Sequence, residues 1–465
     1  IVIVGIALLW HVLACTESPM AFSPDGQNLA FVIMEKQEGG NESIADKTTF
    51  KLMVLSGGKQ IRTIENTSKY ILTGPAYSPD GKSICYLRIP LVAKEDAKER
   101  KQRFEMRAKK LNEIETAAQK DLPKLVIKSD SNPQSKVTTT DLDLTLPPAN
   151  TIYEAMKSML LAAQLSATLV VRDSQAYDIV SLTEIKLPVF AQPNEELWFT
   201  YLATRLQYSP DSQWIYVPAN NLIQAVNSET QEIRILAAPV AVRLEKSFIT
   251  VAILSPDGKT IAALIGNDKP IVAFFQTDGQ VVTYRKLDFK PSFAGMAWKD
   301  SDTLALLSPD KDKKNSEKTR LNFIRSDGTI LEPLLLQLPQ HPSSDQDEFI
   351  TTELALAPNG KHMVISFGKD VFFLTTEGRV LKHQHSTDES KLVQPTFTPD
   401  STQVAFKSFI EKNDSRIYTI VFFTCRGEEI SRINIPQMPR GKSVQSVIEK
   451  PSFIPQKSTF DPETN

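Results

Sequence analysis

Residues 22–26 read Phe-Ser-Pro-Asp-Gly, and a short apolar run at residues 29–32 begins three residues after them. An aromatic residue or Leu, followed by Ser-Pro-Asp-Gly or a near copy of it, recurs along the chain. The six clear copies lie at residues 22–26, 77–81, 208–212, 254–258, 356–360 and 397–401. A degenerate copy without proline lies at 298–302, and a partial copy lies at 453–456. This self-similarity indicates a repeat architecture rather than the separate domains that 465 residues would otherwise suggest.

Each copy has the chemistry of a tight turn between two strands. In the first copy, Pro24 presets φ, Asp25 accepts the next turn position and Gly26 takes the left-handed one. Behind this hairpin comes a second pair of β-rich runs, such as FKLMVLSGGKQIRTI at residues 50–64. Glycines mark the turn of the second hairpin in five repeats, at Gly58, Gly279, Gly328, Gly378 and Gly427. Each repeat is therefore predicted to contain four antiparallel strands.

The spacing of the repeats predicts the architecture. Equivalent turn positions at 24, 79, 210, 256, 300, 358, 399 and 455 are 55, 131, 46, 44, 58, 41 and 56 residues apart. Apart from the long step, this matches the period of a propeller blade, about 40–50 residues. Because a four-stranded sheet cannot bury both faces alone, the blades must stack radially. We expect an all-β propeller over residues 16–460 with a tail at 461–465. Seven blades are complete, and the partial copy at 452–460 leaves eight as the alternative.

The 131-residue step predicts a helical and linker insertion in the second blade, at residues 93–168. A charged helix at 94–121 carries a thin apolar stripe, a Pro/Ser/Thr-rich linker follows, and residues 151–165 form a more apolar helix. Ordering such a segment costs free energy unless its apolar stripe is covered. We therefore expect the insertion to cover one propeller face or to bind a partner protein. The candidate partner-binding residues are Phe104, Leu111, Ile114, Met156, Met159 and Leu160.

The start of the chain predicts a membrane address. Residues 1–14 are almost entirely apolar, and Ala14-Cys15 follows them in the manner of a bacterial lipobox, whose cysteine is diacylated. Residues 1–15 are thus expected to be a signal peptide with lipidation at Cys15. Ordinary secretion and a longer membrane anchor are the alternatives. Since the first residue is Ile rather than Met, we expect the natural chain to begin further upstream.

Composition and motifs argue against several chemistries. The net charge is −2, so nothing favours nucleic acid as a partner, and the basic run at 98–110 is interpreted as a solvated helix face. Cys85 and Cys425 lie in apolar runs and are expected to be buried thiols. His383 and His385, near Asp388 and Glu389, could hold a metal, but a solvated loop is favoured and no metal or cofactor is predicted. The repeated turn aspartates are expected to cap backbone N–H groups rather than to act as acids.

The turn motif and the apolar strand behind it resemble the repeat of the bacterial TolB-like, WD-repeat-like propellers, over residues 18–460. Prolyl-oligopeptidase-type enzymes carry a related propeller, but this sequence has no G-x-S-x-G motif and no segment for a hydrolase domain. The resemblance implies that partner proteins or peptides bind at a propeller face or at the mouth of the channel.

These observations favour a non-enzymatic propeller in the periplasm or cell envelope, anchored to a bacterial membrane and serving as a protein-interaction platform. Two alternatives stay open. A propeller enzyme with an active site at the channel mouth predicts polar side chains converging in the channel. An extracytoplasmic sensor domain of a truncated transmembrane receptor predicts more coding sequence before Ile1.

Overall fold

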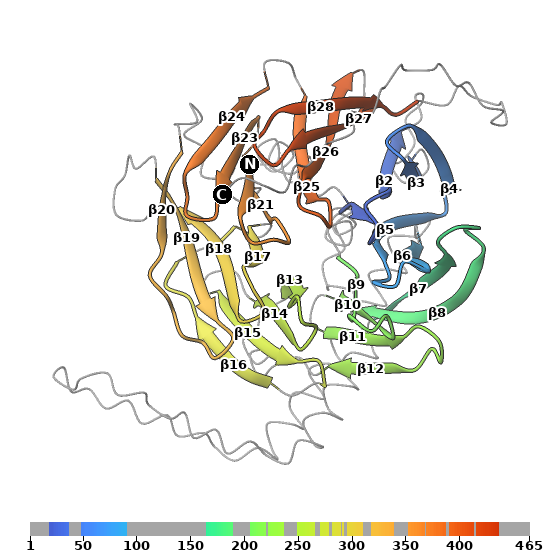
Figure 1. Cartoon of the computed structure of the whole chain (residues 1–465). Helices are drawn as coiled ribbons and strands as arrows, with labels where there is room; N and C mark the ends of the chain where they lie inside the picture. The colour runs from blue at the N-terminus through green and yellow to red at the C-terminus, as the bar shows by residue number, and fades with distance from the viewer. Residues whose placement is uncertain are drawn as a thin grey trace, which may run out of the picture. The chain divides into compact units, whose positions relative to one another are not determined.

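Seven four-stranded antiparallel sheets form a ring in the computed structural model of the protein (Figure 1). The structure describes residues 18–36, 48–90, 164–188, 205–219, 222–236, 249–265, 270–278, 281–289, 291–292, 295–309, 318–338, 352–367, 369–386, 390–412 and 415–436. The regular structure in these stretches is β-strand. None of them forms a helix with the length and apolar character needed to cross a lipid bilayer. The predicted propeller of seven four-stranded blades is thereby confirmed.

Each blade uses four consecutive strands. Blade 1 comprises β1 (Ala21–Phe22), β2 (Asn28–Lys36), β3 (Thr48–Ser56) and β4 (Gln60–Thr67), and blade 2 comprises β5 (Tyr70–Tyr77), β6 (Ser83–Pro90), β7 (Gln164–Asp173) and β8 (Ile179–Pro188). Blade 3 comprises β9 (Gln207–Tyr208), β10 (Trp214–Ala219), β11 (Leu222–Asn227) and β12 (Ile233–Leu236), and blade 4 comprises β13 (Ile249–Leu254), β14 (Thr260–Ile265), β15 (Ile271–Gln276) and β16 (Val281–Lys286). Blade 5 comprises β17 (Met296–Trp298), β18 (Thr303–Pro309), β19 (Lys318–Arg325) and β20 (Leu334–Gln337). Blade 6 comprises β21 (Glu353–Leu356), β22 (His362–Phe367), β23 (Asp370–Thr375) and β24 (Val380–His385), and blade 7 comprises β25 (Lys391–Phe397), β26 (Gln403–Lys412), β27 (Ser415–Thr424) and β28 (Glu429–Asn434).

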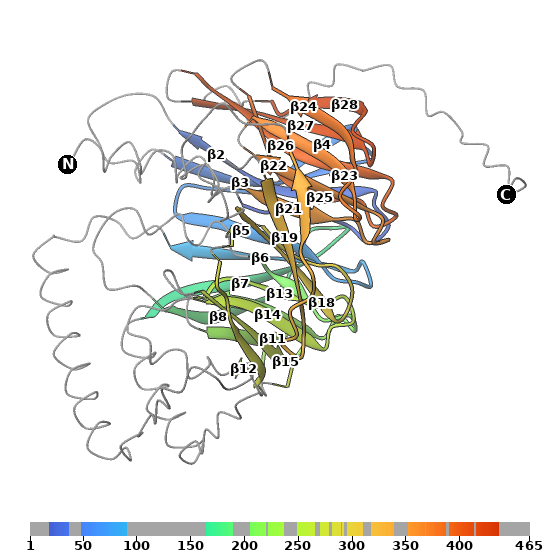
Figure 2. The ribbon, with the colours of Figure 1, turned by 90° about the vertical axis from the view of Figure 1, so that its left-hand side faces the viewer.

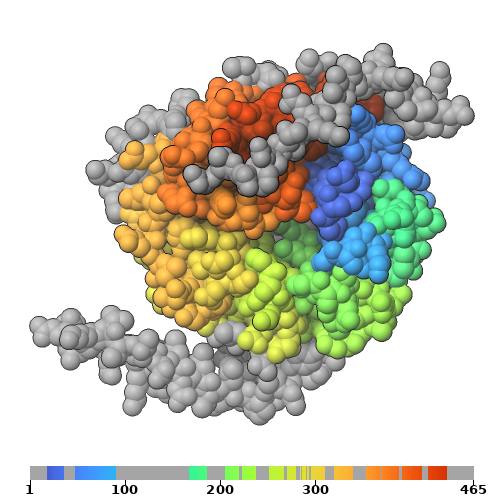
Figure 3. Space-filling view, in the orientation of Figure 1, coloured from blue at the N-terminus to red at the C-terminus, as the bar shows by residue number. Residues whose placement is uncertain are grey.

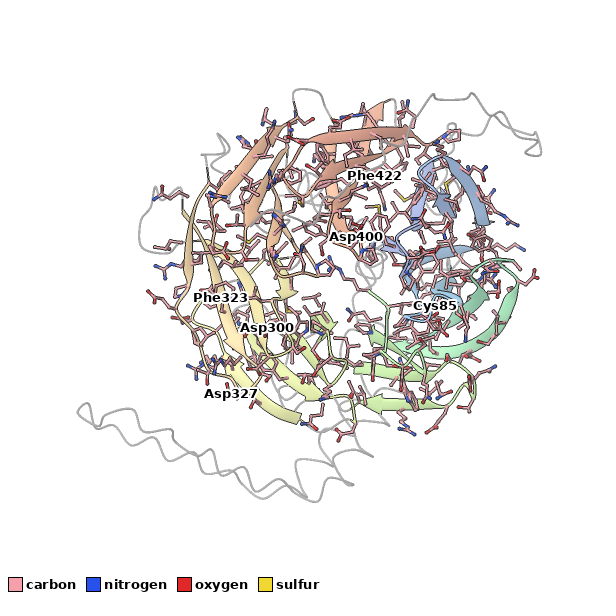
Figure 4. All side chains as sticks on the ribbon, viewed as in Figure 1. Cys85, Asp300, Phe323, Asp327, Asp400 and Phe422 are labelled. Carbon is pink, nitrogen blue, oxygen red and sulfur yellow. The ribbon has the colours of Figure 1, made fainter. Side chains whose placement is uncertain are left out.

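The repeated turn joins the first two strands of a blade as predicted. In blade 1, Gly26 has φ of 70°. The Asp25 carboxylate accepts a hydrogen bond from the Gln27 backbone N–H at 3.0 Å, and the Ser23 hydroxyl accepts one from the Asn28 N–H at 2.9 Å. Equivalent aspartates accept backbone N–H groups in blades 2, 3, 4 and 7. The aspartates therefore cap the turn. Figure 4 shows one of them, Asp400 of blade 7, nearer the ring centre than Phe422 of the same blade.

Radial stacking explains the composition of the central strands. Residues 29–33 of β2 are all apolar and at most 2% exposed. A strand with one solvated face would alternate apolar and polar residues, whereas a strand covered on both faces is apolar throughout. Figure 2 shows the blades lying face to face, so neighbouring blades cover both faces of the central strands in each sheet. Cys85 of β6 is fully buried, as predicted, whereas Cys425 is only partly buried.

The ring closes where blade 7 packs against blade 1. Every described blade is continuous in sequence, so closure relies on side chains rather than on a shared strand. Phe31 and Phe409 belong to one buried apolar cluster formed by the two blades. Lys407 of β26 is fully buried and donates from Nζ to the carbonyl oxygens of Ser18 and Val32, each at 2.9 Å. A charged hydrogen-bond donor therefore bridges the first and last blades.

In the second blade, the boundary between the insertion and the propeller differs from the predicted one. Strand β7 begins at Gln164, so residues 164–168 belong to the propeller rather than to the predicted insertion at 93–168. Residues 164–168 pair with residues 184–188 of β8, and Thr168 also pairs with Arg88 of β6. Other predicted features lie outside the described residues: the signal peptide and Cys15, the helices and linker up to residue 163, the partial eighth copy at 452–460 and the tail at 461–465.

Candidate functional site

The innermost strands of all seven blades surround a central cavity of about 460 Å³. Residues of β1, β5, β9, β13, β17, β21 and β25 contribute to its wall, and Figure 3 shows the ring hollowed at its centre. Most of these side chains are apolar, and four prolines are among them: Pro19, Pro75, Pro358 and Pro395. A cavity of this size, with apolar walls and a few polar groups, is typical of a ligand site. We therefore take the central cavity as the candidate functional site.

Polar side chains reach this region from one position of the repeat. Three residues before the aromatic residue or Leu that opens each turn stand Pro19, Gly74, Arg205, Val251, Gly295, Glu353 and Gln394. Four of the blades therefore place a small or apolar residue here. Blades 3, 6 and 7 instead place an arginine, a glutamate and a glutamine. These departures from the repeat distinguish the three blades chemically.

Glu353 begins β21 and is only 4% exposed. Its Oε1 accepts a hydrogen bond from Gln394 Nε2 at 2.9 Å, and its Oε2 accepts from the Gln394 backbone N–H and from the Ser366 hydroxyl, the latter at 3.1 Å. Burial raises the pKa of this carboxyl to about 7, against the opposing effect of the hydrogen bonds and of the charges on Arg205 and Lys407. Glu353 is thus held in place and changes its charge near neutral pH.

The backbone of Gln394 explains why its N–H reaches Glu353. Gln394 has φ of 57°, in an irregularity of the β25–β26 pairing between Val393 and Thr396. Such a bulge turns a backbone N–H away from the strand ladder and frees it for another acceptor. Blade 2 has the same device at Gly74, whose N–H donates to the Ser18 hydroxyl at 3.1 Å. In blade 7 the bulge holds a carboxylate instead.

Arg205 precedes β9 and lies half-buried in the cavity wall. Burial lowers the pKa of its guanidinium, while the charge of Glu353 opposes this effect. Within the part of the protein that the structure describes, the guanidinium makes no hydrogen bond and no ion pair. Gln207, two residues after Arg205, also lines the cavity. Its side-chain Oε1 accepts a hydrogen bond from the Leu254 backbone N–H at 2.6 Å. The cavity wall therefore carries a cation that, among the described residues, has Glu353 within electrostatic range but no direct ion pair.

The histidine pair of blade 6 forms a different cluster. His383 and His385 lie on strand β24 rather than in the predicted loop. His383 Nε2 and His385 Nδ1 both donate to Asp370 Oδ1, at 2.7 and 2.8 Å, and His383 stacks on Phe372. Among the described residues, no group of three or more His, Cys, Asp or Glu side chains is arranged to hold a metal ion. Asp388 and Glu389 lie outside the described residues.

The site residues predicted from the sequence lie outside the described part of the protein. They are Cys15, Phe104, Leu111, Ile114, Met156, Met159 and Leu160. The residues that the structure brings together, Arg205 with Glu353 and Gln394, were not among the candidates. Their signal is present in the sequence as charged or polar residues at a repeat position that is otherwise small or apolar.

Comparison with known proteins supports the fold. No family model and no curated protein matches this sequence. The chain is similar to a solved prolyl endopeptidase, with 11% identity and a TM-score of 0.50 over 93% of this chain and 52% of that one. It is also similar to the β-propeller domain of Myceliophteria thermophila Cps50 (Swd1), with 9% identity and a TM-score of 0.48 over 88% and 96% of the two proteins. For the dihydro-heme d1 dehydrogenase NirN the identity is 10% and the TM-score 0.42, over 90% and 66%.

The chain thus spans about half of the length of the prolyl endopeptidase it matches. At these identities the likeness shows the propeller fold alone, and propellers carry many unrelated functions.

Proposed function

We propose that this propeller is a non-enzymatic, extracytoplasmic interaction platform of the TolB-like kind, which holds a segment of a partner protein in its central cavity. The observation that supports this most is the guanidinium of Arg205, which lines the cavity and makes no hydrogen bond or ion pair within the described residues. An unpaired charge in a partly desolvated site costs free energy, which a ligand group can recover on binding. Apolar and proline walls around it suit an extended peptide better than a small polar metabolite.

Capture of partners from native membranes by chemical crosslinking tests this proposal. Ala355 lines the cavity, so Ala355→Phe should fill it, whereas Ala176 is exposed in an outer turn and Ala176→Phe serves as the matched control. We expect Ala355→Phe to lose partners that wild type and Ala176→Phe both recover, with the near-UV circular dichroism unchanged. Recovery of the same partners by all three proteins would exclude the cavity as the binding element.

The insertion, which ends at residue 163 because β7 begins at Gln164, is the second proposed binding element, through the apolar stripes named above. Deleting it, or introducing Phe104→Asp together with Leu111→Asp, should remove partners in the same crosslinking experiment if the insertion binds them. Charge reversal of the basic face separates an electrostatic contact from an apolar one, because only the electrostatic contact weakens steeply with salt. The residues reversed are Arg100, Lys101, Arg103 and Arg107. If the insertion variants lose the crosslinked partners and Ala355→Phe retains them, the partners bind the insertion rather than the cavity.

Membrane attachment through a lipid on Cys15 belongs to the same proposal. Expressed in a Gram-negative host with a restored start, the protein should incorporate labelled palmitate and partition with membranes. Cys15→Ser should abolish both. Labelling that survives this substitution would contradict the lipoprotein interpretation. Further coding sequence upstream that encodes receptor domains would instead favour the sensor alternative.

One observation favours a propeller enzyme as the alternative function. Burial raises the pKa of Glu353 to about 7, which is the property of a general acid working near neutral pH. Hydrolysis of ester, glycoside and phosphate substrates can be screened between pH 6 and 8, with Glu353→Gln as the control. Turnover that disappears in Glu353→Gln would establish the enzyme and overturn the platform proposal.

A further inference from the structure

Among the described residues, two other half-buried arginines are held by a carboxylate, whereas no hydrogen bond or ion pair of Arg205 is seen there. In blade 2, Arg88 donates from Nε to Glu65 Oε1 at 2.6 Å, and Arg172 donates from Nη2 to Glu65 Oε2 at 3.1 Å. Both guanidinium groups thus share one carboxylate at the boundary between blades 1 and 2. Arg205 has a carboxylate within electrostatic range, that of Glu353, but no hydrogen bond joins them among the described residues. Among the described residues, no other acceptor takes its N–H donors either.

Other groups than Arg205 hold the carboxylate of Glu353 in place. Gln394 and Ser366 supply three donors to that carboxylate. Arg205 and Glu353 also stand in blades 3 and 6, which are separated by blades 4 and 5 in the ring (Figure 1). Arg205 lines the cavity from blade 3, whereas Glu353 is buried in blade 6 and is hydrogen-bonded to Gln394, which lines the cavity from blade 7.

We propose that the central cavity is a carboxylate-binding site, in which Arg205 holds a carboxylate carried by the partner segment. This inference rests on the proposed function and names the chemistry of its ligand. A guanidinium presents a planar fork of N–H donors that matches a carboxylate in a bidentate geometry. Gln207, at i+2 from Arg205 and therefore on the same face of an extended segment, adds the NH₂ end of its side-chain amide, which makes no hydrogen bond within the described residues.

The charge of the site favours a carboxylate over a phosphate. One guanidinium beside a fixed carboxyl group can balance a single negative charge, whereas a phosphate group carries close to two at neutral pH. Most of the other lining residues are apolar or proline. A monoanion on an apolar or extended carrier is therefore the best match. Such a carboxylate can belong to a Glu or Asp residue or to the C-terminus of a polypeptide.

Glu353 makes the binding sensitive to pH. The groups that face it are Arg205, Lys407, Gln394 and Ser366, and burial is the main reason that its pKa is raised. At pH 6 the carboxyl is mostly neutral, so the positive field at Arg205 is unopposed. At pH 8 it is ionised and repels an anionic guest. A carboxylate ligand should therefore bind more tightly at the lower pH.

Isothermal titration of the protein with short peptides tests the site. The probes are N-acetyl-Ala-Ala-Glu-amide against its Gln counterpart, and N-acetyl-Ala-Ala-Ala as the free acid against its amide. We expect the Glu peptide, the free acid or both to bind, and the corresponding amides to bind about tenfold to a hundredfold more weakly. The two pairs distinguish the carboxylate of a Glu residue from that of a C-terminus. Equal binding of acids and amides, or no binding by either acid, would overturn the proposal.

Variants identify the cation. Arg205→Gln should weaken the acid peptides about tenfold or more, whereas Arg379→Gln, which changes an exposed arginine of an outer turn, should not. On wild type, the bound acid should also protect Arg205 from phenylglyoxal, as read by mass spectrometry, so the result does not depend on how the variant folds. Equal affinity of Arg205→Gln and Arg379→Gln, or no protection, would contradict the assignment.

The pH dependence adds a separate readout. Wild type should bind the acid probe about fivefold or more tightly at pH 6 than at pH 8, and Glu353→Gln should lose this dependence. A pH dependence that persists in Glu353→Gln would exclude Glu353 as its source. If crosslinked partners are lost in Ala355→Phe but retained in Arg205→Gln, the result supports the interaction platform and refutes the carboxylate site.

Discussion

Contacts between the repeated turns give the sharpest test of how the blades fit together. The turn glycine of one blade lies over the turn proline of the preceding blade, as for Gly81 over Pro24. At Gly258 the approach is closest, because a Cβ added there would lie 2.1 Å from Pro210 Cδ. Gly360 holds the same position in blade 6, yet a Cβ there would meet nothing within 4 Å. The two glycines thus differ in contact but hardly in conformation, with φ of 73° and 68°.

This pair allows the cost of the contact to be separated from the cost of the backbone. An alanine in the left-handed region costs about 1–2 kcal/mol, and both Gly258→Ala and Gly360→Ala carry this cost. A clash in a packed site adds about 1–3 kcal/mol, because rigid neighbours must shift. The pyrrolidine ring of Pro210 cannot rotate away as a flexible side chain would. We therefore expect Gly258→Ala to destabilise the propeller by about 2–5 kcal/mol and Gly360→Ala by about 1–2 kcal/mol.

Urea unfolding followed by tryptophan fluorescence measures both free energies. Pro210→Ala removes the ring that Gly258→Ala would strike, so the double variant should recover most of the difference. Pro210→Ala alone serves as the third corner of the cycle. Equal destabilisation by Gly258→Ala and Gly360→Ala would refute the contact. So would a double variant whose losses simply add.

Three further outcomes follow from the described residues. Cys85, fully buried with its pKa raised by burial to about 12, should react with a thiol reagent only on unfolding, whereas the partly buried Cys425 should react in the native protein, as mass spectrometry would show. Burial acts to raise the pKa of Glu65, but hydrogen bonds from Arg88 and other donors outweigh it and hold the pKa low. The stability from this carboxylate should therefore be present above its unfolded pKa and lost as the pH falls through its folded pKa, so wild type should lose more stability than Glu65→Gln between pH 6 and 3 in urea titrations. Deleting residues 93–163 should leave a cooperatively folded protein by near-UV circular dichroism, whereas deleting 93–168 also removes the start of β7 and should melt at lower temperature.

The local geometry of the blades could be predicted from the sequence because the turn carries it. Proline, aspartate and glycine each act on their own backbone, so no distant residue is needed to place the turn. Even where glycine is replaced, the turn keeps its shape: Ser212 and Ser401 adopt φ of 64° and 63°. Such a motif, repeated in register, determines the hairpins, and the spacing between copies determines the number of blades.

The start of β7 could not be predicted in this way. Residues 161–168 are mostly apolar or small, and short runs of this kind fit a helix or a buried strand equally well. What decides between them is the partner: Thr168 pairs with Arg88 of β6 and with Glu184 of β8. Both partners are separated from this run by a turn or by the whole insertion. Tertiary pairing therefore overrides the local preference.

The residues of the cavity site could not be predicted from the sequence for a related reason. Each member of the site belongs to a different blade, so Arg205 and Glu353 come within electrostatic range only when the ring forms. Four blades fill the same repeat position with Pro, Gly or Val, because packing around the cavity needs no charge there. A charged residue at that position incurs a desolvation cost, which hydrogen bonds from Gln394 and Ser366 offset in part at Glu353. Departures from a repeat at cavity-lining positions are therefore better guides to binding chemistry in a propeller than the repeated motif itself, which serves the turns.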